Sequence, residues 1–139
     1  MSQVKYQRTI ATETSCTGVG LHTGVETTIT FKPAGEGFGI RFKRMDVEGC
    51  PEIKADIDHV VDISRGTTIE ENGVRIHTVE HALAACVGIG LDNVLIELTE
   101  KEPPVMDGSS IDFVEALLKA GIVKQNQPRN YLHIDEAVG

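Results

Sequence analysis

The sequence predicts an α+β fold, with strands in its first half and two helices in its second half. Apolar and polar residues alternate over residues 25–32, which is the period of a half-buried strand. Asn72-Gly73 lies between two β-rich runs, and this dipeptide readily adopts the positive φ angles of a tight hairpin turn. Residues 79–87 and 111–119 are rich in apolar residues, and we expect each segment to form a helix.

A second alternating run follows a Gly-rich turn at residues 35–39. We expect it to pair with residues 25–32 as a hairpin, which is the simplest topology. Basic residues interleave with Phe31 and Phe42 in these two runs; they are Lys32, Arg41, Lys43 and Arg44. We interpret them as the solvated face of the strands, because side chains alternate between the two faces of a sheet.

The first helix is expected to begin at Thr78, whose hydroxyl can cap exposed backbone amides. Its body over residues 79–87 is apolar on nearly every side, apart from Glu80 and His81. A helix with this pattern is typical of the centre of a protein rather than of its surface.

The second helix is expected to begin near Ser109 or Ser110, because Ser109 and Asp112 approximate a capping box. Its predicted apolar stripe consists of Ile111, Val114, Leu117 and Leu118. Gly121 can adopt the left-handed conformation that ends many helices. Between the helices, residues 93–98 predict a strand, and Pro103-Pro104 predicts an extended loop.

Composition restricts the possible partners and the cellular location. With 13 Lys and Arg against 21 Asp and Glu, the net charge of −8 argues against nucleic acid as a general partner. Cys16, Cys50 and Cys86 form neither a disulfide framework nor a thiolate metal motif, and Cys86 is expected to be a small buried residue. The absence of a signal peptide and of an apolar membrane-spanning stretch predicts a cytoplasmic location.

The chain of 139 residues suits one domain, or one domain and the start of another. Residues 125–130 are polar and predict a linker, and residues 131–135 alternate like the beginning of a strand. We therefore expect a first domain over residues 1–124, a linker over 125–130, and the start of a truncated second domain over 131–139.

Glu80 and His81 are the most informative candidates for chemistry, because they fall in the first turn of the predicted helix. The positive end of the helix dipole favours a carboxylate and disfavours an imidazolium. Adjacent helical residues point about 100° apart, so one metal ligand beside one base is the natural division of roles. In the alternative hypothesis, the two residues only cap a helix in a non-catalytic α+β interaction module.

His77 and His81 have the i, i+4 spacing of a metal-binding pair, which leaves a small metal-binding protein as a third hypothesis. A cap at Thr78 would leave His77 outside the helix. Residues 18–24 form a Gly-spaced turn with His22 at its tip, without the spacing of a dinucleotide loop. Residues 107–110 are interpreted as the turn that leads into the second helix.

Four stretches, in this order, resemble the UDP-3-O-acyl-N-acetylglucosamine deacetylase family. They are GVGLHTG at residues 18–24, RIHTVEHALAA at 75–85, GIGLDNVLIEL at 88–98 and PPVMDGSS at 103–110. The resemblance implies a two-layer sandwich in which a mostly antiparallel β-sheet packs against two helices, with a small β insert. Some bacteria carry this enzyme fused to a 3-hydroxyacyl carrier-protein dehydratase. The sequence does not decide whether the parent protein of this chain is such a fusion.

The resemblance also implies a zinc-dependent hydrolase of lipid A synthesis, which removes the acetyl group of UDP-3-O-(3-hydroxyacyl)-N-acetylglucosamine. It places the single zinc ligand of the first domain at His81 and the general base at Glu80. Residues that match cleft-lining regions of the family are Leu21, His22, Ser64, Arg65 and Gly66. The family often has larger apolar or sulfur-bearing residues at the last three of these positions.

The remaining zinc ligands of the family, a His and an Asp, come from the second domain. We therefore expect this chain alone to bind no catalytic zinc tightly and to be inactive, because a protein normally supplies at least three ligands. An apolar patch exposed in place of the second domain would favour self-association. The fatty chain of the substrate makes transient contact with a membrane surface plausible.

Overall fold

The computed structural model describes residues 5–63 and 66–129. The strands are β1 (Tyr6–Ile10), β2 (Thr14–Val19), β3 (Glu26–Pro33), β4 (Ile40–Arg44), β5 (Glu52–Lys54), β6 (Val60–Asp62), β7 (Thr68–Glu71), β8 (Val74–Ile76), β9 (Val94–Leu98) and β10 (Ile122–Pro128). The helices are α1 (Glu80–Gly88) and α2 (Ile111–Ala120), with a short 3-10 turn, η1 (Ile57–His59).

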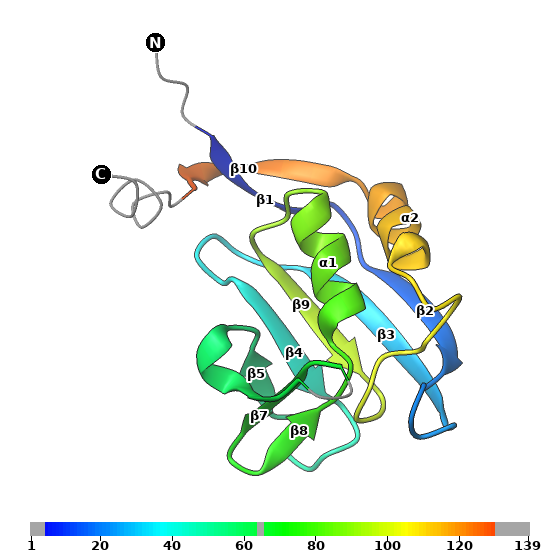
Figure 1. The fold of residues 1–139 in the computed structure, drawn as a ribbon. Helices are drawn as coiled ribbons and strands as arrows, with labels where there is room; N and C mark the ends of the chain where they lie inside the picture. The colour runs from blue at the N-terminus through cyan, green and yellow to red at the C-terminus, as the bar shows by residue number, and fades with distance from the viewer. Residues whose placement is uncertain (1–4, 64–65, 130–139) are drawn as a thin grey trace.

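The main sheet has five strands in the order β2-β3-β9-β4-β5, and its pairs are antiparallel except for β4 with β9. Both helices cover one face of this sheet, as Figure 1 shows. Strands β6, β7 and β8 form a separate small sheet, and β1 pairs with β10 in a two-stranded ribbon. The predicted α+β sandwich with a small β insert is confirmed.

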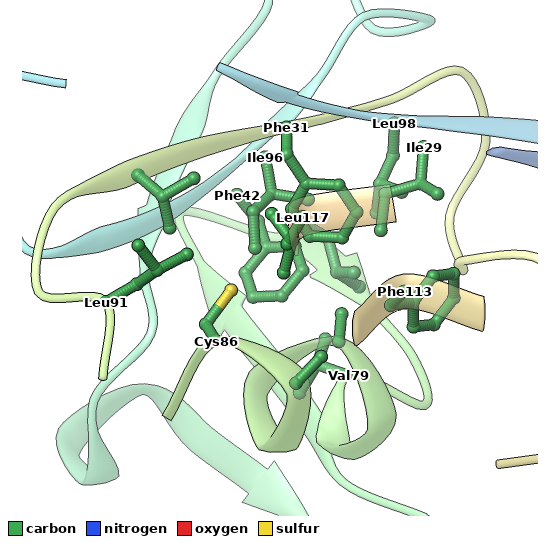
Figure 2. Packing of buried hydrophobic residues seen from close by; sticks show 14 of the residues in the cluster. Ile29, Phe31, Phe42, Val79, Cys86, Leu91, Ile96, Leu98, Phe113 and Leu117 are labelled. Atoms are coloured by element: carbon green, nitrogen blue, oxygen red, sulfur yellow. The ribbon is translucent and has the colours of Figure 1, made fainter. Parts of the chain in front are cut away.

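The core lies between the main sheet and the helices. Phe31 of β3 and Phe42 of β4 both pair with Ile96 of β9, and all three side chains are completely buried. The Phe113 ring of α2 meets the Phe31 ring edge-on, with 5.9 Å between the ring centroids. Cys86 of α1 faces the same cluster (Figure 2). Burial raises the pKa of the Cys86 thiol to about 12, as suits a buried apolar residue.

The expected hairpin between residues 25–32 and 38–43 is wrong, because β9 lies between β3 and β4. Val94, Ile96 and Leu98 are all completely buried, so β9 has the apolar character of a central strand. The four basic residues are all partly exposed, and Lys32 pairs with Glu97 of the neighbouring strand β9 at 3.3 Å.

The predicted apolar stripe of α2 is partly wrong. Phe113, Leu117 and Ala120 form the buried face, whereas Ile111 is 57% exposed and Leu118 is 56% exposed. Contact with the sheet selects the face that carries Phe113, and this leaves the two other apolar residues on the outer side.

The predicted linker at residues 125–130 is wrong over its first part, because residues 125–128 belong to β10. Gln125 donates from Nε2 to the carbonyl of Ala34 and accepts at Oε1 from the amide nitrogen of buried Asn93. Polar residues are therefore used here to attach the ribbon to the sheet. The strand expected at residues 131–135 lies outside the described residues. Among the described helices, none is long and apolar enough to span a membrane.

Candidate active site at the start of helix α1

Glu80 and His81 are the first two residues of α1, so they lie in its first turn as predicted. Their side chains are 36% and 38% exposed, and 4.0 Å separates Glu80 Oε2 from His81 Nε2. The expected cap at Thr78 is wrong, since Val79 is the capping residue and no side chain caps this end. Thr78 has a φ of 56°, and its Oγ1 donates instead to Glu102 Oε2 at 3.3 Å.

The Glu80 carboxylate lies against the backbone of residues 66–67. Its Oε1 accepts a hydrogen bond from the Thr67 amide at 2.8 Å, which fixes the carboxylate outside the helix rather than on a helical amide. A Cβ at Gly66 would lie 3.0 Å from Glu80 Oε2, and Gly66 has a φ of +101°. Gly66 therefore combines a backbone conformation that suits glycine with close approach to the carboxylate.

Among the described residues, none forms a hydrogen bond with a ring nitrogen of His81. The Glu80 carboxylate, at 4.0 Å from Nε2, is too far away for one. The loop at residues 107–109 lies within electrostatic reach of His81. The pKa of the Asp107 carboxyl is held below its usual range mainly by hydrogen bonds from Ser109, and the charge of His81 adds a smaller effect. Because Asp107 and Ser109 bond to each other and Ser109 Oγ accepts from the Ile111 amide, the loop is the turn that leads into α2, as expected.

A cavity of about 530 Å³ lies next to this site. Residues that line it include His22, Thr23, Gly66, Thr68, His77 and Lys101. Burial, followed by the charge of Lys101, lowers the pKa of the His77 imidazole, whose Nδ1 lies 3.1 Å from Thr68 Oγ1. His77 is outside α1, as its position before Thr78 predicted. Gly66 lines this cavity and also lies beside Glu80, so the Glu80 carboxylate is close to the cavity.

The turn at residues 20–24 connects β2 to β3 and carries Leu21, which is 57% exposed, and the exposed His22. Glu102 Oε1 accepts hydrogen bonds from the amides of His22 and Thr23, at 2.9 and 2.8 Å. Glu102 is completely buried. The burial of Glu102 was not predicted, because a single Glu before Pro103-Pro104 carries no pattern in the sequence that indicates burial.

The structure thus brings Gly66 to Glu80 and places His22 at the neighbouring cavity. Ser64 and Arg65, which were also expected to line the cleft, lie outside the described residues.

The donor set of the described residues fits one part of a metal site. The half-exposed imidazole of His81 supplies a nitrogen of the kind that zinc prefers. Within residues 5–63 and 66–129, no group of three or more His, Cys, Asp or Glu side chains could hold a metal ion. The His81 imidazole is thus a candidate metal ligand among the described residues.

The chain is thus a two-layer α+β domain with a Glu-His pair at the start of a helix. Comparison of its sequence with protein families identifies the class. Residues 7–139 match the family model of UDP-3-O-acyl N-acetylglycosamine deacetylase, LpxC, so the chain belongs to this family.

Its relatives carry matching names. The bifunctional enzyme LpxC/FabZ of Chlorobaculum tepidum is 59% identical over 133 residues, which are 96% of this chain and 28% of that protein. The UDP-3-O-acyl-N-acetylglucosamine deacetylases of Thioalkalivibrio sulfidiphilus and Xanthomonas oryzae pv. oryzae are 44% and 42% identical, over 95% of this chain and 43% and 44% of those proteins. The chain thus spans less than half the length of these curated relatives.

Proposed function

We propose that this chain is the first domain of a zinc-dependent deacetylase that hydrolyses the acetamide of UDP-3-O-(3-hydroxyacyl)-N-acetylglucosamine in lipid A synthesis. Family membership supports the reaction class, and the relatives' names support the substrate. The observation that carries the proposal is the Glu80–His81 pair at the start of α1, with one Glu80 oxygen held by Thr67 and the other facing His81.

Glu80 serves as the general base and His81 as one zinc ligand. Because the Thr67 amide binds Oε1, the Oε2 atom is the oxygen that takes a proton from the attacking water. Zinc, when bound, supplies a Lewis acid and lowers the pKa of a bound water. The small residue at Gly66 keeps Oε2 accessible from the cavity side.

The remaining zinc ligands come from a second domain in this proposal, and the chain alone is inactive. Apolar side chains on the outer side of the helices support a covering partner. Val87 of α1 is 67% exposed, and Ile111 and Leu118 of α2 are more than half exposed. Such a surface also favours self-association when the partner is missing.

Zinc titration by calorimetry tests the half-site directly. We expect no tight binding to the 139-residue chain or to a His81→Ala variant. Tight one-to-one binding that the variant loses would show that the chain forms a complete site by itself, and would contradict the proposal.

Activity is tested in a chimera in which this chain replaces the matching 133 residues of the Chlorobaculum tepidum enzyme. We expect deacetylation that Glu80→Ala abolishes and that Glu48→Ala, at an exposed loop position, leaves unchanged. The rival hypothesis of a non-catalytic interaction module predicts a folded but inactive chimera.

A further inference from the structure

Glu102 is a buried carboxylate whose hydrogen-bond donors among residues 5–63 and 66–129 are all neutral. It is completely buried, and among the described residues it takes part in no ion pair. Its three hydrogen bonds come from two backbone amides and one hydroxyl. Because a buried charge is costly without such bonds, the donors must be held in place for the carboxylate to remain there.

The two oxygens of Glu102 bind two separate parts of the chain. Oε1 accepts from His22 and Thr23, in the turn between β2 and β3. Oε2 accepts from Thr78, which stands two residues before Glu80. One carboxylate therefore joins the turn at the cavity to the segment that leads into α1.

Backbone features on both sides accommodate this carboxylate. At Gly20 a Cβ would lie 2.3 Å from Glu102 Oε1 and 2.5 Å from Thr23 Oγ1, so any larger residue would displace both atoms or shift the backbone. On the other side, Thr78 adopts a φ of 56°, which is unfavourable for a β-branched residue, and its side chain is buried with the hydroxyl on Glu102. Strain and close approach on two sides of a single side chain indicate a position under strong constraint.

We infer that Glu102 is a positioning residue, which fixes the turn that carries His22 relative to Glu80 and His81. Its attachment of the turn follows from the geometry alone. Its effect on catalysis rests on the proposed function, in which Glu80 and His81 perform the chemistry.

The Glu102→Gln variant tests the attachment without removing volume. The amide oxygen can accept from both turn amides, and the amide nitrogen can donate to the Thr78 oxygen, so the variant is expected to fold. Hydrogen bonds to a charged group are roughly twice as strong as neutral ones. We therefore expect the amides of His22 and Thr23 to exchange about tenfold faster by NMR. The Leu83 amide, which donates to the carbonyl of the capping residue Val79, should keep its exchange rate.

Gly20→Ala provides a second perturbation, since its Cβ would press on the Glu102 carboxylate, without changing its charge, and on Thr23 Oγ1 of the turn. It should accelerate exchange at the same two amides. The matched control is Gly88→Ala, because a Cβ at Gly88 meets no atom within 4 Å. Equal acceleration at Leu83, or unchanged rates at His22 and Thr23 in the Gln variant, would overturn the attachment.

The catalytic consequence is measured in the Chlorobaculum chimera. We expect Glu102→Gln to lower kcat/KM about tenfold while the Tm and the zinc content stay at the parent values. Loosened turn amides with unchanged kcat/KM would overturn the positioning role. If the parent chimera is inactive, the proposed function fails, and the exchange rates still decide whether Glu102 holds the turn.

Discussion

Two histidines in this domain lie next to carboxylates, and the protein uses them differently. His59, at the end of η1, contacts Asp56 through Nδ1 at 2.5 Å and Glu71 of β7 through Nε2 at 3.0 Å. His81, at the start of α1, lies 4.0 Å from Glu80 through Nε2. The first imidazole has a carboxylate at both ring nitrogens. Among the described residues, the second has only Glu80 near one ring nitrogen, and Asp107 acts on it through charge alone.

This difference separates a structural histidine from a candidate ligand. His59 connects η1 to the small sheet, and a metal would have to displace its two partners. His81 has a ring nitrogen that can still accept a metal, and its neighbour Glu80 is anchored by Thr67 rather than by the imidazole. Both histidines have a carboxylate nearby, so the two sites differ in whether the ring nitrogens are already bound to protein partners.

The largest expected effect comes from replacing the carboxylate beside His81, with the carboxylate beside His59 as the control. In the Chlorobaculum chimera, Glu80→Gln should lower kcat by about 10²- to 10⁴-fold, because the amide cannot take a proton. Glu71→Gln, beside His59, should leave kcat unchanged. Measured kcat values for both variants test the comparison, and a similar loss in the two would show that the carboxylates matter only for folding.

A change at Gly66 tests whether the backbone around Glu80 is as constrained as its contacts indicate. Gly66→Ala introduces a Cβ 3.0 Å from Glu80 Oε2 at a φ of +101°. We expect a loss of about 1–3 kcal/mol in the free energy of unfolding, measured with urea. Gly88→Ala is the control, and it should be neutral or slightly stabilising. Equal stability of the two variants would mean that the residues around Gly66 adapt without cost.

Sequence patterns predicted the local elements better than their arrangement. The alternation through Ile29 and Phe31 predicted β3, and Asn72-Gly73, with φ angles of 54° and 82°, predicted the β7–β8 turn. Both are local signals. The insertion of β9 between β3 and β4 depends on contacts far apart in the sequence, which periodicity does not contain. For the same reason, the polar strand β10 resembled a linker.

The candidate site shows the same limit. Glu80 and His81 were recognisable because they fall in a helix start within a family motif. Glu102 was not, because its burial is produced by two distant segments that fold around it. Thr78 was assigned the role of a cap from its residue type, yet its left-handed backbone directs the hydroxyl to Glu102. Residue type predicts chemistry, while the partner of a side chain depends on the assembled fold.

The smallest expected effect concerns the pH dependence of the His59 contact. The hydrogen bond that His59 donates to the Asp56 carboxylate, together with the charges of Asp56, Glu71 and Asp58, raises the pKa of His59 above its ordinary value of 6.5. Because protonated His59 binds these carboxylates in the folded state, the contact contributes its full stabilisation below pH 6.5. This contribution disappears as the pH rises through the pKa of His59 in the folded state. The same contact with His59 lowers the pKa of Asp56 below 3.8, so that contribution disappears only in strong acid.

The contact between His59 and Asp56 is therefore expected to stabilise the fold at pH values between the pKa of Asp56 and the pKa of His59 in the folded state. We expect the Tm difference between the parent chain and His59→Gln to be largest on the acid side of pH 6.5 and to decrease at higher pH. Because both partners are solvent-accessible, the difference should be small and should decrease further in high salt. Glu71→Gln, which keeps Asp56, should show part of the effect. A Tm difference independent of pH would mean that His59 contributes by packing, and the contrast with His81 would then rest on geometry alone.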